Sequence, residues 1–106
     1  MAIYRIYEWS NKNGDESNTY YVSDKETADK KVADILDYYT SQGYADSQYE
    51  VICEAYTVDK MMEEDSDLVD MELEADKPQF IDTAILDMVR GWHYGNEWQG
   101  ARGTQP

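Results

Sequence analysis

Acidic side chains gather in one part of this 106-residue chain, and they are the residues with the most evident chemistry. Between Asp46 and Asp76 there are twelve acidic residues and one basic residue, Lys60, so this segment carries −11 of the formal net charge of −14. Carboxylates at this density can ligate a cation, act as acid–base pairs or attract a basic partner. Because so many like charges repel one another, we expect the segment to form a solvated surface.

Metal ligation is the first chemistry to weigh. Residues 63–67 and Asp70 offer the oxygen ligands that calcium prefers. A calcium-binding EF-hand loop also needs a central glycine, and no glycine occurs between Gly43 and Gly91. We therefore expect no dedicated metal site and no cofactor, and a carboxylate-based calcium module is only a third alternative.

Catalysis has little support in the sequence. The single histidine, His93, lies between Trp92 and Tyr94 after an expected helix end, where a histidine is more often packed than catalytic. The chain has no nucleophile elbow, no zinc-ligand spacing and no phosphate-binding glycine loop. Pairs such as Glu63 and Glu64 should be solvated, whereas catalytic carboxylates are few and partly buried. We expect that the protein is not an enzyme.

Charge and cysteine usage narrow the partners further. Only nine Lys and Arg residues are present, which argues against direct binding to nucleic acid or to an anionic membrane. No window approaches the roughly 18 apolar residues of a membrane span. The single cysteine, Cys53, follows Val51 and Ile52, so we expect a buried, reduced thiol. These features together predict a cytoplasmic protein.

The first half of the chain reads as a hairpin followed by a helix. Residues 3–9 and 18–22 are rich in aromatic and β-branched types, and Asn13 with Gly14 is a strong turn signal between them. The capping-box pattern from Ser23 to Glu26 predicts a helix from Asp24 to about residue 41, ended by Gly43. Residues 48–58 predict a third strand.

The second half is less uniform in its patterns. Residues 59–67 predict an acidic loop or helical turn, and residues 69–76 then alternate apolar and acidic types, which favours a strand. The residue types there (Met, Glu, Leu, Ala) favour a helix instead, so both structures stay open, with the strand slightly ahead. The capping sequence of residues 76–79 predicts a last helix up to Arg90, closed by Gly91.

The order β-β-α-β-(β)-α predicts a small α+β domain of two layers: an antiparallel sheet of three to four strands with two helices on one face. We expect one domain over residues 1–95 and a Gly-rich tail over residues 96–106.

The acidic segment predicts a row of charges in either conformation. In a strand, alternate acids from Asp70 to Asp76 would project on one side at steps of about 6.6 Å. In a helix, Asp70 and Glu74 would align about 5–6 Å apart. Such a row resembles phosphates along a nucleic-acid strand and would be attracted to a basic channel. The candidate partner-binding residues are Asp34, Asp37, Glu50, Glu54, Glu63, Glu64, Asp65, Asp67, Asp70, Glu72, Glu74 and Asp76.

In size, charge and aromatic content, with ten tyrosines, the chain resembles the small acidic inhibitors that bacteriophages and mobile elements encode against restriction, CRISPR and transcription machinery. The resemblance is one of composition, centred on residues 34–76. It implies a non-catalytic DNA mimic that occupies the basic nucleic-acid-binding channel of a host defence or transcription protein, of the anti-restriction or anti-CRISPR type.

A second interpretation stays open beside the DNA mimic. Acidic surfaces also serve only to keep a protein in solution. The chain would then be a small structural or adaptor protein that binds a partner through its aromatic surface, with Trp92, Tyr94 and Trp98 as candidate contacts.

Overall fold

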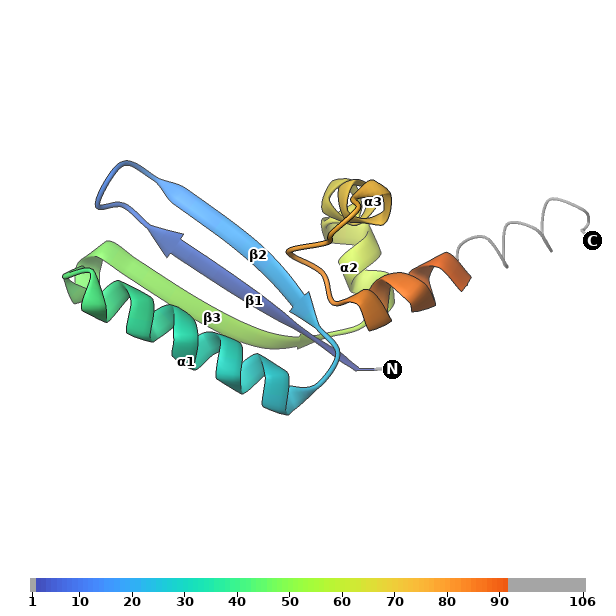
Figure 1. The fold of residues 1–106 in the computed structure, drawn as a ribbon, viewed down its shortest axis with the longest axis horizontal. Helices are drawn as coiled ribbons and strands as arrows, with labels where there is room; N and C mark the ends of the chain where they lie inside the picture. The colour runs from blue at the N-terminus through green and yellow to red at the C-terminus, as the bar shows by residue number, and fades with distance from the viewer. Residues whose placement is uncertain (1, 92–106) are drawn as a thin grey trace, which may run out of the picture.

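A three-stranded antiparallel sheet forms the base of the structure, a computed structural model that describes residues 2–91. The strands are β1 (Ile3–Ser10), β2 (Glu16–Val22) and β3 (Tyr49–Tyr56), in the order β2-β1-β3 (Figure 1). Gly14 turns the β1–β2 hairpin with a φ of 95°, which side chains with a Cβ rarely adopt. The sequence-based prediction of an α+β fold with an opening hairpin is confirmed.

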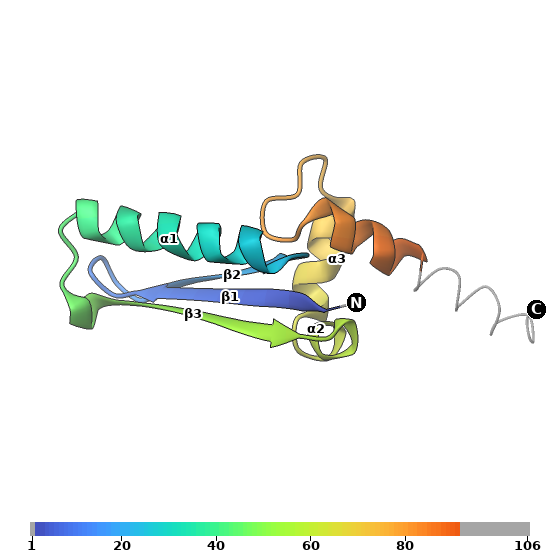
Figure 2. The same cartoon turned by 90° about the horizontal axis from the view of Figure 1, so that it is seen from below.

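Helix α1 (Lys25–Ser41) covers one face of the sheet (Figure 2). Strand residues alternate between faces, so Ile6 and Val22 point toward α1 and pack with its Ala28, Ile35 and Tyr39. After α1, Gly43 turns the chain with a φ of 77°. A 3₁₀ turn (Asp46–Gln48) then leads into β3.

The start of α1 differs from the capping box expected at Ser23. Asp24 is the N-cap, and its carboxylate accepts the Thr27 N–H at 2.8 Å. The Ser23 hydroxyl instead donates to Asp82 at 2.7 Å, because the last helix begins beside it in space.

The remaining helices gather at one end of the sheet (Figures 1 and 2). They are α2 (Val58–Glu64), α3 (Ser66–Glu74) and a helix over residues 83–91. Only α1 therefore lies along a sheet face, whereas two helices were expected there. A second core joins this helical end to the sheet, and its buried members are Ile3, Tyr21, Tyr56, Met61, Val69, Ile81, Ile85, Leu86 and Val89.

The slight preference for a strand over residues 69–76 was wrong, since Ser66–Glu74 is helical. Leu68, Val69 and Leu73 pack against the second core at helical spacing. Met71, which a strand would have placed on the same side as Val69 and Leu73, is 52% exposed. Helix propensity and helical burial therefore outweigh the short alternating pattern.

The last helix begins at residue 83, later than the expected capping sequence of residues 76–79. Phe80 and Ile81 lie before it and run beside β2: the Tyr21 N–H donates to the Phe80 oxygen at 2.8 Å, and the Asp82 N–H donates to the Tyr21 oxygen at 2.9 Å. Asp82 takes the capping role, since its carboxylate accepts the Ala84 N–H at 3.1 Å. The expected domain end at residue 95 and the Gly-rich tail lie outside the described residues.

Within residues 2–91, no helix is both long and apolar enough to cross a bilayer.

Glu72 supplies the first testable prediction. Its buried carboxylate accepts the N–H groups of Phe80 and Ile81, the latter at 2.9 Å, so Glu72→Ala leaves two amides without an acceptor. We expect a loss of about 2–4 kcal/mol in the free energy of unfolding, measured by urea denaturation. The matched control Glu74→Ala, on the exposed side of α3, should stay within about 0.5 kcal/mol of the parent protein. Equal effects of the two substitutions would contradict the structural role of Glu72.

Candidate interaction surface

Helix α3 presents a stripe of carboxylates to solvent. Asp67, Asp70 and Glu74 are exposed and lie three and four residues apart, so they share one side of the helix. Their spacing along the axis is about 4.5 and 6 Å, and the stripe is about 10 Å long. Val69 and Glu72 occupy the buried side. Among the described residues, none of the three stripe carboxylates forms an ion pair.

Helix α2 adds negative charge beside this stripe. Asp59 and Glu63 are exposed on α2. This helix contacts α3, and Asp65 connects the two helices. Asp76 is exposed just after α3. We call this set the α2–α3 carboxylates: Asp59, Glu63, Asp67, Asp70, Glu74 and Asp76. Lys60 is the one cation on the two helices, and its ammonium group lies 4.5 Å from the centre of the Tyr56 ring.

Three of the acids expected to bind a partner hold the fold together instead. Glu72 is only 3% exposed, and its carboxylate accepts hydrogen bonds from the backbone N–H groups of residues 80 and 81. It is therefore no longer a candidate for binding a partner. Asp65 accepts the Tyr21 hydroxyl and lies 3.6 Å from the Arg5 Nε. Glu64 accepts the Tyr56 hydroxyl at 2.8 Å. Glu64 is nevertheless exposed, whereas Asp65 is partly buried and Glu72 is buried. Sequence spacing alone does not show which acids accept hydrogen bonds from the fold.

The other candidate acids do not extend the α3 stripe as one row. Asp34 and Asp37 are exposed on α1. On β3, Tyr49 and Val51 pack under α1, so Glu50 and Glu54 point to the opposite face of the sheet. Glu54 lies 4.0 Å from the Arg5 guanidinium. The α1 pair and the β3 pair are therefore separated by the thickness of the sheet.

The sheet face opposite α1 carries aromatic and apolar side chains, and the sequence alone does not show which of the strand tyrosines are exposed. Tyr7 and Trp9 on β1 are partly exposed, and Ile52, paired with Tyr7 on β3, is 39% exposed. No helix of residues 2–91 runs along this face over most of its length (Figure 2). The alternation of Tyr7, Glu8 and Trp9 was the signal available in the sequence. We call Tyr7, Trp9 and Ile52 the open-face residues.

Under α1, Glu8 is a buried carboxylate held by tyrosines. Its two oxygens accept the hydroxyls of Tyr20 at 2.6 Å and Tyr39 at 2.5 Å. Burial, followed by the hydrogen bond to Glu8, raises the pKa of Tyr39 to about 12. The same two causes raise the pKa of Tyr20 above its ordinary range. One acid in a strand carries no sequence signature, so the role of Glu8 is visible only in the structure.

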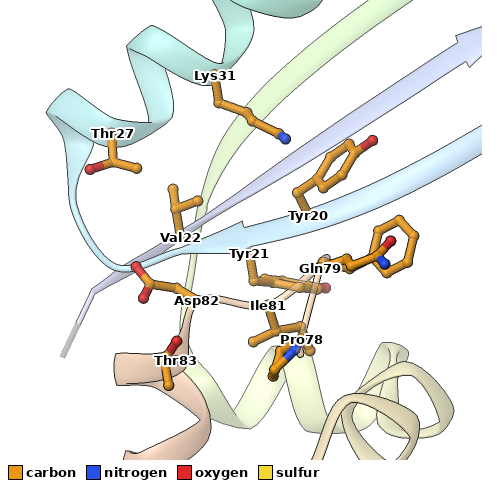
Figure 3. Close-up of a pocket in the computed structure, with 11 residues that line it drawn as sticks. Tyr20, Tyr21, Val22, Thr27, Lys31, Pro78, Gln79, Ile81, Asp82 and Thr83 are labelled. Carbon is orange, nitrogen blue, oxygen red and sulfur yellow. The ribbon is translucent and has the colours of Figure 1, made fainter. Parts of the chain in front are cut away.

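A hollow of about 330 Å³ lies where β2, α1 and the segment before the last helix meet (Figure 3). The polar groups that line it interact with other parts of the chain. Asp82 accepts hydrogen bonds from Ser23 and Ala84, and the Lys31 ammonium lies 4.1 Å from the centre of the Tyr20 ring.

Residues 2–91 also contain no group of three His, Cys, Asp or Glu side chains placed to hold a metal ion. His93, Trp92, Tyr94 and Trp98 lie outside the part of the chain that is described.

Comparisons of the chain with protein-family models, with curated proteins and with solved structures find no match.

Cys53 is exposed, which overturns the expected buried thiol. It lies on β3, an edge strand of the sheet, where the neighbouring Ile52 and Glu54 are exposed as well. Desolvation, the largest effect, raises the pKa of the Cys53 thiol, against an opposing effect of Lys25.

We expect one thiol to react with a maleimide or disulfide reagent in the native protein, without denaturant. The reaction should be slower than that of a free cysteine at the same pH, because a raised pKa lowers the thiolate fraction. Mass spectrometry of the labelled protein measures the stoichiometry, and unfolded protein in urea is the control. A thiol that reacts only after unfolding would contradict this prediction.

The tyrosines around Glu8 make folding sensitive to alkaline pH. A pKa raised in the folded state from 10.0 to about 12, as for Tyr39, means that the folded form binds its hydroxyl proton more tightly. This contribution to stability is complete below about pH 10 and is lost as the pH rises through about 12. We expect near-ultraviolet phenolate absorbance to show a late titration that coincides with unfolding followed by circular dichroism. In the Tyr39→Phe variant this late component should shrink, whereas Tyr38→Phe should leave it intact.

Proposed function

We propose that this protein is a non-catalytic DNA mimic that occupies the basic nucleic-acid-binding channel of a partner protein. The observation that carries the proposal is the stripe of Asp67, Asp70 and Glu74, which has no ion pair in the described chain and faces solvent. A surface with uncompensated charge of one sign attracts the opposite sign over long range and raises the association rate.

The linear order of the stripe supports a phosphate-like role. Its carboxylates recur at about 4.5 and 6 Å along α3, while one strand of duplex DNA presents a phosphate at every 3.4 Å or so of axis. The stripe is therefore sparser than the phosphates of one strand, and it resembles them in sign and in linear arrangement. Asp59 and Glu63 on α2 add charge beside it.

The charges are also fixed in place before binding. Leu68, Val69 and Leu73 anchor α3 in the second core, and Glu72 ties the helix to the backbone of residues 80 and 81. A rigid row of charges loses less conformational entropy on binding than a disordered acidic tail does. This pre-organisation favours a binding role over simple solubility.

The partner class follows from the charge and from the resemblance in composition. A channel lined with Lys and Arg accepts the stripe as it would accept nucleic acid. Restriction, CRISPR and transcription proteins have such channels, and a host protein of one of these kinds is the proposed target in the cytoplasm.

An adaptor role is the second candidate, and the open-face residues favour it. Tyr7, Trp9 and Ile52 form an aromatic and apolar area on an otherwise acidic protein. Aromatic side chains of this kind dominate many protein–protein contacts. Under this alternative the α2–α3 carboxylates only maintain solubility.

Neutralising the stripe tests the proposal. The triple variant Asp67→Asn, Asp70→Asn, Glu74→Gln should weaken binding to the target by about one to two orders of magnitude. The slope of log affinity against log salt should fall by about three. The target is first captured from a bacterial lysate at low salt. High salt should release it, and duplex DNA should compete it off. The affinity of the purified target for each variant is then measured by calorimetry.

A variant with the same charge change at exposed acids outside the candidate set (Asp15→Asn, Glu26→Gln, Asp46→Asn) is the matched control and should bind nearly as well as the parent protein. If the α3 variant keeps its affinity while Trp9→Ala loses it, the adaptor role replaces the DNA mimic.

A further inference from the structure

A second candidate site lies on the α1 side of the sheet, between β2 and the C-terminal half of α1. A hollow of about 420 Å³ opens there, and a neighbouring one of about 310 Å³ shares Glu8, Asn18 and Tyr38 with it. The two hollows therefore form one groove. The larger hollow is also lined by Ser10, Glu16, Tyr39 and Tyr44.

Glu8 gives this groove its charge. The residue is 9% exposed, and each carboxylate oxygen accepts one tyrosine hydroxyl. A carboxylate has about four acceptor positions, so these neutral donors leave part of its capacity unused. Within residues 2–91, no Lys or Arg forms an ion pair with Glu8. A buried carboxylate without a counter-charge is costly, and a cation entering the groove would relieve that cost.

The aromatic rings beside Glu8 already attract cations from this chain. The Lys12 ammonium lies 4.8 Å from the centre of the Tyr44 ring, and the Lys31 ammonium lies 4.1 Å from that of Tyr20. Tyr38 is 55% exposed at the mouth of the groove, and no cation of the described chain lies over its ring. It is available as a platform for an incoming cation.

A guanidinium group fits these features better than an ammonium group. It is planar, so it can stack on a tyrosine ring, and it presents parallel N–H donors that match a carboxylate. Glu16 and Asp34 also line the groove, so its charged lining consists of three carboxylates and one ammonium group, that of Lys31. We propose that the groove between β2 and α1 binds a guanidinium side chain, with Glu8 as its counter-charge and Tyr38 as its stacking surface.

This site is independent of the proposed function. Its two hollows open on the α1 side of β2, and none of Asp67, Asp70 and Glu74 lines either of them. One site can therefore fail its test without affecting the other.

Calorimetry with Nα-acetyl-arginine amide tests the proposal on the full chain. We expect saturable binding with a dissociation constant in the millimolar range or below, as befits a ligand of this size. The citrulline counterpart has nearly the same shape and no charge, and we expect it not to bind. Absence of saturable arginine binding up to tens of millimolar, or equal binding of the citrulline compound, would overturn the proposal.

One variant and its matched control test whether arginine binds at Glu8. Glu8→Gln should lower the affinity for the arginine compound about tenfold or more, through loss of the charge-assisted hydrogen bonds. Glu50→Gln makes the same charge change on the opposite face of the sheet and should leave the affinity unchanged. An equal loss in both variants would mean non-specific attraction to an acidic protein and would reject the site.

Tyr38→Ala decides the matter if Glu8→Gln does not fold by circular dichroism. Tyr38 is more than half exposed, so its removal should spare the fold. Weakened arginine binding in this variant supports the site, and unchanged binding rejects it.

Discussion

Tyr21 joins the sheet to the helical end of the molecule, and the placement of the acidic helices depends on it. Its backbone pairs with residues 80 and 82, its hydroxyl donates to Asp65 between α2 and α3, and its ring is fully buried beside Tyr56. One residue at the end of β2 thus holds three segments distant in the sequence. The orientation of the α3 stripe relative to the sheet follows from these bonds.

A chain with a net charge of −14 folds because many of its carboxylates have hydrogen-bond donors. Asp24 and Asp82 cap helices, and Glu72 accepts two backbone amides. Glu8 and Asp65 accept tyrosine hydroxyls. These acids stabilise the fold from within, so the self-repulsion is left mainly to acids that face water, where it is screened. The exposed acids can meet a partner directly, whereas Glu8 can be reached only through the groove that it lines.

Two surfaces of different chemistry result from this division. The α3 stripe offers rigid, exposed charge suited to a broad basic channel, whereas the groove at Glu8 offers one buried charge beside tyrosine rings, suited to a single guanidinium. Both proposals invoke a cationic ligand, yet one depends on long-range attraction and the other on local desolvation. Salt should therefore weaken the first interaction more strongly than the second, because screening acts mainly on exposed charges.

The sequence by itself determined the elements whose signals are local. The turn at Gly14, the helix over residues 25–41 and the third strand follow from patterns that span few residues, and they are confirmed. Part of the α3 stripe could also be predicted from the sequence, since Asp70 and Glu74 align if the segment is a helix. Only the tertiary structure decided that residues 66–74 are helical, that Cys53 is exposed on an edge strand, and that Glu72 is buried. The physical reason is that each of these outcomes depends on how separate segments pack together: the second core for α3, the order of the strands for Cys53, and the path of the backbone at residues 80 and 81 for Glu72.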